Sequence, residues 1–159
     1  MTGIGTAGSL AGTWFGTRLP AEALARLEAQ GRIVSYATGA EILREGDPTR
    51  SLAVVVHGRV ALRLRVPERG LTTILTVEEG NIVGWTAVVP PHRATSTVVA
   101  LVPTDLLLLD GERLRAELDA DPILAAAVYR SLLEALAIRL SGTRMQLLDL
   151  FSQHGDEPW

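Results

Sequence analysis

The sequence predicts a mainly β domain, a sandwich or barrel of short strands with a helix at each end. Seven short runs rich in β-branched residues follow one another between residues 33 and 109, about every ten residues, with turn residues between them. Strands of this length and spacing are typical of sandwiches and barrels. Apolar residues recur at helical spacing before and after this region. A chain of 159 residues is long enough for one domain with a substantial core.

The sequence indicates one domain over residues 14–151, with a tail at each end. Residues 1–13 are rich in Gly, Ala and Thr and lack the basic leader and apolar run of an export signal. We interpret this segment as a flexible tail, and 152–159 as a second tail. Within the domain, the strands are expected at about 32–110 and the C-terminal helices at 111–151.

An N-terminal helix is expected between Pro20 and Gly31, because proline favours the first turn of a helix and glycine commonly follows the last. Trp14 and Phe15 precede this helix and are expected to anchor it in the core. The apolar residues at helical spacing within it are Ala23, Leu24 and Leu27.

The β region that follows contains one strand with a clear two-residue period. From Val60 to Val66, apolar side chains alternate with Ala61, Arg63 and Arg65, so one face is expected in the core and the other in water. The expected strands are 33–36, 41–43, 52–56, 60–66, 72–77, 95–100 and 104–109.

Two helices are expected after Asp110. The first is brief, over residues 111–118, and the second begins at Pro122 with Asp121 as its N-cap and continues to about Phe151. Its length would be roughly 45 Å. Its apolar residues form two stripes, which imply two partners: the parent β domain and a second copy of the same helix. The first stripe is Leu124, Val128 and Leu132, and the second is Leu133, Leu136, Leu140, Leu147 and Phe151.

The composition excludes several classes of protein. The absence of cysteine excludes disulfides, thiol nucleophiles and Cys-based zinc sites, and it fits a cytoplasmic protein. The net charge of −3 argues against direct DNA or RNA binding. No run of about eighteen apolar residues suggests a membrane span. Because every basic residue is an arginine, only the position of an arginine is informative.

Nothing in the sequence resembles a reaction centre, so we expect no catalytic residue, no metal and no cofactor. The histidines, His57, His92 and His154, lie in turns and the tail without the paired spacing of a metal site. Glu78 and Glu79 are adjacent, and adjacent strand residues point to opposite faces. The chain also lacks a nucleophile-elbow turn.

The segment 82–100 has the composition of a small anion-holding loop. It contains a glycine at a strand end, a short apolar turn, two prolines, Arg93 and a β-branched strand. Backbone N–H groups in such a turn can face an anion, and an arginine can bind two phosphate oxygens. We expect Arg93 to point into a cavity lined by Val83 and Leu75, with the long helix as a lid. A buried arginine needs an anion, and a phosphate or a distant carboxylate would serve. The same composition also fits an ordinary connection between strands.

These features together resemble the cyclic nucleotide-binding domain of the catabolite activator protein and Fnr family over about residues 14–151. The resemblance implies a β-roll, that is, a jelly-roll-like double-stranded β-helix, with an N-terminal helix and a long C-terminal helix. It also implies a stand-alone member without the helix-turn-helix of the family's regulators. The motifs that carry it are Glu45-Gly46-Asp47, Val56-His57-Gly58-Arg59-Val60, Gly84 with Arg93-Ala94, and the long helix.

The resemblance assigns a ligand site. In the 84–94 loop, Gly84 matches the family's loop glycine, Arg93 the phosphate arginine and Ala94 the small residue after it. Thr143 and Arg144 match the helix positions that reach the purine base. The expected ligand-binding residues are Val83, Gly84, Trp85, Thr86, Ala87, Arg93, Ala94, Thr95, Thr143 and Arg144.

The 84–94 loop departs from the family pattern at Trp85, which stands where the family has a glutamate that binds the ribose 2′-hydroxyl. A carboxylate accepts a hydrogen bond, whereas an indole only donates one. Loss of this contact costs roughly 1–3 kcal/mol, or about ten- to a hundredfold in affinity. The interval from Gly84 to Arg93 is also at least one residue short.

The sequence therefore predicts a non-enzymatic sensor that binds cyclic AMP, cyclic GMP or another phosphorylated small molecule. It is expected to form a homodimer through the Asp121–Phe151 helix, and the sequence does not identify a downstream partner. The alternative is a degenerate domain that binds no nucleotide and acts as a dimeric interaction scaffold. That alternative predicts a closed cavity and an Arg93 paired with a protein carboxylate.

Overall fold

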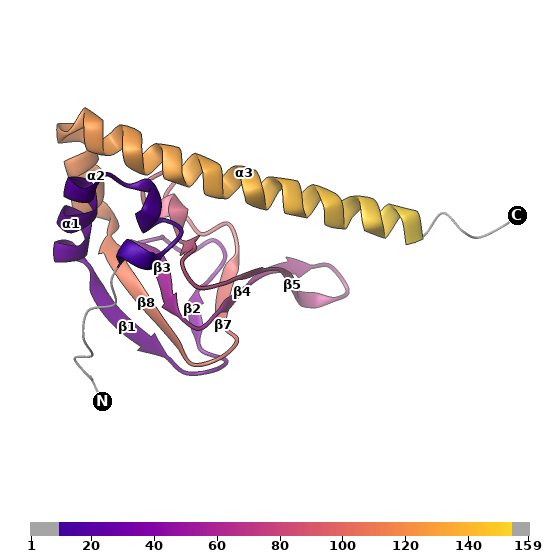
Figure 1. The fold of residues 1–159 in the computed structure, drawn as a ribbon. Coiled ribbons are helices and arrows are strands. Elements are labelled where there is room, and N and C mark those ends of the chain that lie inside the picture. The colour runs from indigo at the N-terminus through magenta and orange to yellow at the C-terminus, as the bar shows by residue number, and fades with distance from the viewer. Residues whose placement is uncertain (1–9, 154–159) are drawn as a thin grey trace, which may run out of the picture.

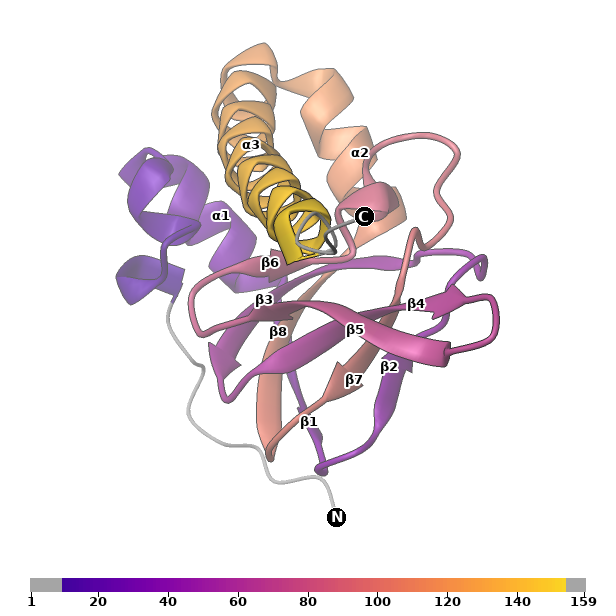
Figure 2. The same cartoon turned by 90° about the vertical axis from the view of Figure 1, so that its right-hand side faces the viewer.

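The computed structural model describes residues 10–153 and forms a β-roll with helices gathered on one side (Figures 1 and 2). The described strands make two four-stranded antiparallel sheets, in the orders β1-β8-β3-β6 and β2-β7-β4-β5. The predicted fold class is confirmed. The strands are β1 Arg32–Tyr36, β2 Glu41–Leu43, β3 Ser51–His57, β4 Val60–Val66, β5 Gly70–Val77, β6 Ile82–Val83, β7 Thr97–Ala100 and β8 Thr104–Asp110.

The seven predicted strands are present, and the eighth, β6, escaped the sequence analysis. It consists of Ile82 and Val83 alone, which is too short to show a period. It pairs with Ala53 and Val54 of β3, and this pairing fixes the entry to the 84–94 loop. β7 begins at Thr97 and not at residue 95, and β8 ends at Asp110 and not at residue 109. Differences of this size are usual when strand ends are predicted from sequence.

The N-terminal segment is more ordered than the sequence suggested. Within the expected tail, residues 1–9 lie outside the described part of the chain, but residues 10–12 form a 3-10 turn, and Leu10 and Thr13 are buried. Leu10 is fully buried, and the hydroxyl of Thr13 donates to Leu10 O at 2.7 Å and accepts from Gly16 N at 2.9 Å. The expectation of a flexible tail is therefore wrong for residues 10–13. The elements are the 3-10 turns η1 Leu10–Gly12 and η2 Gly16–Arg18, and the helix α1 Ala21–Gln30.

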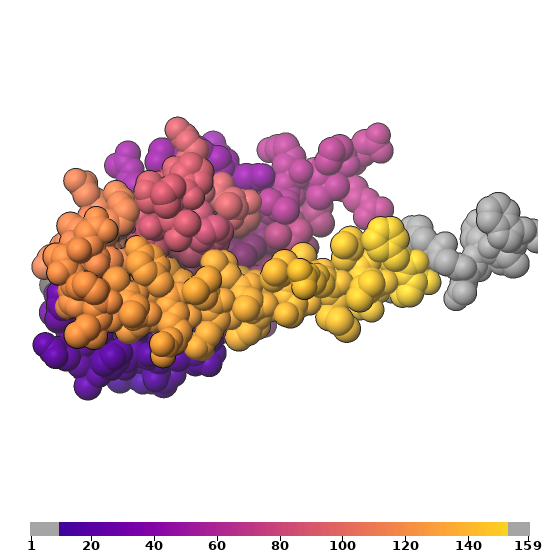
Figure 3. Space-filling view, turned by 90° about the horizontal axis from the view of Figure 1, so that it is seen from above, coloured from indigo at the N-terminus to yellow at the C-terminus, as the bar shows by residue number. Residues whose placement is uncertain are grey.

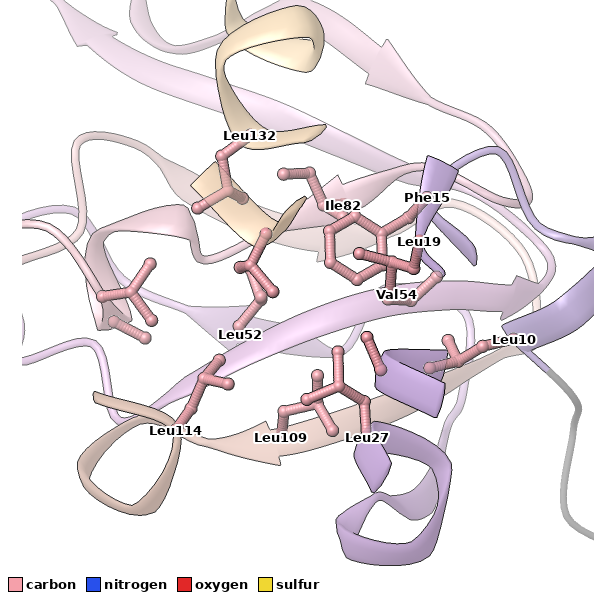
Figure 4. Packing of buried hydrophobic residues seen from close by; sticks show 14 of the residues in the cluster. Leu10, Phe15, Leu19, Leu27, Leu52, Val54, Ile82, Leu109, Leu114 and Leu132 are labelled. Atoms are coloured by element: carbon pink, nitrogen blue, oxygen red, sulfur yellow. The ribbon is translucent and has the colours of Figure 1, made fainter. Parts of the chain in front are cut away.

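One core joins the helices to the first sheet. Side chains from the N-terminal turns, α1, β3, β8 and the C-terminal helices meet on the outer face of this sheet (Figure 4). As predicted, Phe15 is a fully buried anchor, and Trp14 packs against the edge of the cluster. A second, smaller core of mostly β-branched residues fills the space between strands of the two sheets; it includes Ala53, Val55 and Val98.

Each C-terminal helix begins at an aspartate cap. In α2, Gly111–Ala120, the carboxylate of Asp110 accepts from Arg113 N at 2.8 Å. In α3, Pro122–Gln153, Asp121 accepts from Ile123 N at 3.0 Å and Leu124 N at 3.1 Å, as predicted for an N-cap. The bond from Leu124 N, together with the hydrogen bond from Arg26, holds the pKa of Asp121 below its usual value.

The helix α3 presents two apolar stripes, and only the first is covered. Its C-terminal end extends past the β4–β5 hairpin and so beyond the rest of the described domain (Figures 1 and 3). The helix continues through Gln153, so the expected tail begins later than residue 152, and 154–159 lie outside the described residues. None of the described helices is long and apolar enough to cross a membrane. The buried stripe is Leu124, Val128 and Leu132, and the second stripe includes the exposed side chains of Leu133, Leu140, Leu147 and Phe151.

Ion pairs connect the N-terminal segment to both ends of the buried half of α3. Arg18 Nε lies 2.6 Å from Glu134 Oε2, and its guanidinium stacks on the ring of Trp14 at 3.7 Å. Arg26 Nη1 lies 2.6 Å from Asp121 Oδ2. These pairs are partly exposed, so they fix orientation more than they add stability.

We predict that Ser131→Ala stabilises the protein by about 1 kcal/mol. Ser131 is 1% exposed on α3, and its hydroxyl has no hydrogen-bond partner among the described residues. Alanine removes the buried unpaired group and is the better helix former. Urea denaturation should show a higher midpoint. As a contrast, Thr13→Val removes a buried hydroxyl with two partners and should lower the midpoint; equal effects for both variants would contradict the assignment.

Candidate ligand-binding site

A cavity of about 170 Å³ lies between the β-roll and α3. Its floor is formed by apolar side chains of β4 and β5, including Leu62 and Leu75. Residues 83–86 and 94–96, at the two ends of the 84–94 loop, form one wall. Arg139 and Thr143 of α3 close it from the other side. The cavity predicted beside Val83 and Leu75, with the long helix as its lid, is present.

Gly84 begins the loop in a conformation that only glycine adopts without strain. Its φ is +71°, and a Cβ placed on it would lie 2.6 Å from Ser51 O. The left-handed turn redirects the chain from β6 into the 3-10 turn η3, Trp85–Ala87. Glycine is therefore needed at position 84 both for its φ and for the space.

The turn η3 is fixed by hydrogen bonds from three directions. Thr86 Oγ1 donates to Thr49 Oγ1 at 2.7 Å, and His92 Nδ1 lies 2.9 Å from Thr86 O. From α2, Arg115 donates to Ala87 O. Ala87 is buried and does not line the cavity, so this predicted site residue supports the turn from behind.

The exit of the loop pairs with the turn before β3. Ala94 N donates to Asp47 O at 2.9 Å, and Gly46 N donates to Ala94 O at 2.8 Å. Thr49 N donates to His92 O at 2.8 Å. The Glu45–Asp47 motif thus acts as a backbone brace for the loop.

The structure corrects the expected direction of Arg93. Its side chain is exposed, does not line the cavity, and donates from Nη1 to Gly46 O at 2.9 Å. An isolated antiparallel bridge pairs the backbone of Arg93 with Pro48, next to the Gly46 carbonyl that its side chain contacts. The carboxylate partner that the scaffold alternative requires is also absent, because Arg93 forms no ion pair within residues 10–153.

Arg139 is the cavity's cation among the described lining residues, and the sequence analysis missed it. It is half-buried on α3, and its guanidinium donates to Ile82 O. Desolvation lowers its pKa to about 10, so it remains charged at neutral pH. The available signal was its spacing from Thr143, since residues four apart share one helix face. Thr143 Oγ1 donates to Arg139 O at 2.9 Å.

The cavity brings most of the predicted ligand residues together. Arg144 is exposed and, like Arg93 and Ala87, does not contribute to the wall. The predicted residues that line it are Val83, Gly84, Trp85, Thr86, Ala94, Thr95 and Thr143.

A second cavity of about 220 Å³ shares the wall formed by Leu43, Val83, Gly84 and Val98. It opens between β1, β2 and β3, and Arg50 stands at its edge. Val83 and Gly84 therefore separate the two cavities.

Of the described histidines, His92 supports the turn η3 through Thr86 O, and His57 does not line the cavity. His57 Nδ1 lies 3.0 Å from Glu79 Oε1 at the β3–β4 turn, and His154 lies outside the described residues. Within residues 10–153, no three His, Cys, Asp or Glu side chains are grouped to hold a metal.

The fold and the cavity define a β-roll domain whose cavity is closed by its own C-terminal helix. The family model "Cyclic nucleotide-binding domain" matches residues 33–121, more than half of the chain. The chain therefore belongs to the cyclic nucleotide-binding domain family.

Individual relatives agree with this family. A CRP-like cAMP-activated global transcriptional regulator of Mycobacterium tuberculosis is 27% identical over 129 residues, which cover 80% of this chain and 55% of the regulator. This chain thus spans about half the length of that relative. A cyclic nucleotide-binding domain from Methylobacillus flagellatus matches with a TM-score of 0.75 and 26% identity, covering 82% of this chain and 74% of that one. The Thermus thermophilus catabolite activator protein matches with a TM-score of 0.66 and 25% identity, covering 84% and 61%.

Substitution of Gly84 should be costly for steric as well as conformational reasons. We predict that Gly84→Ala destabilises the protein by about 2–4 kcal/mol, since the positive φ and the contact with Ser51 O both penalise a Cβ. Gly39→Ala is the matched control: its φ is +83°, but nothing lies within 4 Å of the added Cβ. Thermal unfolding should separate the two variants, and equal losses would show that the contact with Ser51 is unimportant.

Proposed function

We propose that this chain is a non-enzymatic sensor domain that binds a cyclic nucleotide, cyclic AMP or cyclic GMP, in the cavity between the 84–94 loop and α3. The observation that carries the proposal is the placement of Arg139 and Thr143 opposite Gly84 and Thr86 around one cavity. A cation, several hydroxyls and apolar side chains suit the phosphate, the ribose and the flat base of a nucleotide. The relatives' names support the same ligand class.

Ligand binding would require movement, because the cavity is smaller than the roughly 300 Å³ at the low end of ligand pockets. The 84–94 loop is the element placed to move. A rotation that releases Arg93 from Gly46 O would carry the guanidinium toward the phosphate. Binding would then shift the population of two loop positions and change how α3 rests on the roll.

Dimerisation through α3 belongs to the same proposal. Leu133, Leu140, Leu147 and Phe151 are 67%, 52%, 53% and 69% exposed on one side of the helix. A second copy of α3 would cover these side chains and connect ligand binding in one domain to the position of the other.

One observation favours the alternative function, a dimeric interaction scaffold that binds no nucleotide. Trp85 lines the cavity where a ribose contact is expected, so an indole occupies space that a ligand would need. If the alternative is correct, the dimer persists and nucleotide binding is absent.

Titration calorimetry decides between nucleotide sensing and the interaction-scaffold alternative. We expect heat from cyclic AMP or cyclic GMP at millimolar ligand or below, and an affinity about tenfold or more weaker in Arg93→Ala, since a charge-assisted phosphate contact is lost. Arg44→Ala is the control, because Arg44 is an exposed arginine paired with Glu41 away from the cavity. No heat from either nucleotide, or an Arg93→Ala variant that behaves as wild type, would remove the support for nucleotide sensing through this loop.

Trp85→Glu should strengthen nucleotide binding by about ten- to a hundredfold, because it supplies the missing acceptor for the ribose 2′-hydroxyl. Arg139 lines the same cavity and would keep the new carboxylate ionised. Trp85→Phe keeps an aromatic ring without an acceptor and serves as the control. Fluorescence anisotropy with a labelled cyclic nucleotide measures the difference. Equal affinities of the two variants would contradict the role assigned to position 85.

A further inference from the structure

The second cavity, of about 220 Å³, is larger than the first, and the proposed nucleotide site does not use it. Its deep end is apolar, because Ala53, Val83 and Val98 line it and are only 4%, 3% and 2% exposed. At its mouth, Pro48 and Arg50 are exposed. The cavity therefore runs from solvent into the second core of the roll.

Two small residues of β3 leave this space. Side chains alternate along a strand, and those of Ala53 and Val55 belong to the core between the two sheets, so Ser51 lies on the same inward face. Ser51 and Ala53 both line the cavity, whereas Val55, the next inward residue, is larger and fully buried. The cavity is thus a consequence of two consecutive small side chains on one face of one strand.

Arg50 brings a positive charge without an acidic partner to the mouth of the cavity. Within residues 10–153, its side chain forms no ion pair and no hydrogen bond. Ser51, the next residue, is half-buried, and its hydroxyl likewise has no partner in that part of the chain. A guanidinium can bind both oxygens of a carboxylate, and a neighbouring hydroxyl can donate to one of them. The mouth therefore suits a carboxylate.

The volume and the apolar lining limit what accompanies that carboxylate. An ordered water needs roughly two to four polar partners, which the deep end does not supply. An apolar cavity of about 150 Å³ accepts a benzene ring. A cavity of about 220 Å³ therefore has room for a ring and a short arm that reaches Arg50. It is below the roughly 300 Å³ at which pockets for larger ligands begin.

We propose that the second cavity binds a small aromatic carboxylate, with its ring against Ala53, Val83 and Val98 and its carboxylate on Arg50. The inference goes beyond the proposed function, because neither a cyclic nucleotide nor a dimer is needed for it. Val83 and Gly84 separate this site from the first cavity. The chain would therefore bind two different small molecules on the two sides of one wall.

An NMR titration of the whole chain with phenylacetate tests the site, with phenylacetamide as the neutral analogue of the same shape. Phenylacetate should shift the amide signals of Ser51, Ala53, Val83 and Val98, with a dissociation constant of about 1 mM or below, the range for so small a ligand. Phenylacetamide should bind at the same place at least about threefold more weakly, because it lacks the charge that Arg50 attracts.

Arg50→Gln should lower the affinity for phenylacetate to that for phenylacetamide and leave the affinity for phenylacetamide unchanged. Arg130→Gln is the matched control, because Arg130 is an exposed arginine of α3 that lines neither cavity, and the substitution changes the net charge by the same amount. Arg139→Gln tests the location. It removes the cation of the first cavity, so it should leave phenylacetate binding unchanged if the ligand occupies the second.

Ala53→Leu should fill the deep end and abolish the binding of both compounds. Its thermal unfolding midpoint should be at or above that of the wild type, because the added methyl groups enter existing space. If this variant does not fold, the comparison of Arg50→Gln with Arg130→Gln and Arg139→Gln decides alone.

The inference is overturned if phenylacetate produces no saturable shifts at about 10 mM, or if Arg50→Gln binds it as tightly as Arg130→Gln does. Loss of binding in Arg139→Gln equal to that in Arg50→Gln would place the compound in the first cavity and would also overturn it. The same holds if a folded Ala53→Leu variant still binds. Because no nucleotide is present in these titrations, their failure leaves the proposed function unaffected.

Discussion

The structure depends on the burial of one side of α3 against the first sheet. Leu124, Val128 and Leu132 enter the core that also contains Phe15 of the N-terminal segment and Leu109 of β8. Each buried leucine of this kind contributes about 2 kcal/mol or more, so the N-terminal half of α3 has one stable position. That position determines which residues of the next turns reach the roll. Arg139 and Thr143 close the cavity because they continue the buried side of the helix past the last core contact.

The 84–94 loop depends on backbone geometry more than on its own side chains. The pairing of β6 with β3 brings the chain to Gly84, the left-handed turn redirects it, and hydrogen bonds from the 46–49 segment hold its exit. Arg115 of α2 holds the turn η3 from the other side. The loop is therefore connected both to the roll and to the helix that precedes α3. A change in the conformation of the loop would therefore be transmitted to α3 both through the roll and through α2.

Residues whose role follows from local periodicity were predictable from the sequence. The cap at Asp121 and the two stripes of α3 each arise from patterns of a few neighbouring residues, and each is found in the structure. The alternation predicted for β4 is wrong at its start, because Ala61, expected on the water face, is fully buried between the paired strands β5 and β7. The direction of Arg93 was not predictable, because it depends on pairing with residues 46–49, which are distant in sequence. Arg139 was missed for a related reason. Its guanidinium donates to Ile82 O, which is distant in sequence, and its spacing from Thr143 was the one local signal that it faces the cavity.

The length of α3 gives small changes at the cavity a large effect at a distance. Ala135 is the last residue of α3 in the main core, and the helix extends about 27 Å from there to Gln153. A tilt of the helix by only about 5° about Ala135 would move its far end by about 2 Å. The position of the C-terminal end of α3 therefore depends on how closely the 84–94 loop and α3 approach each other across the cavity. A small change in that separation becomes a larger displacement at the end of the helix.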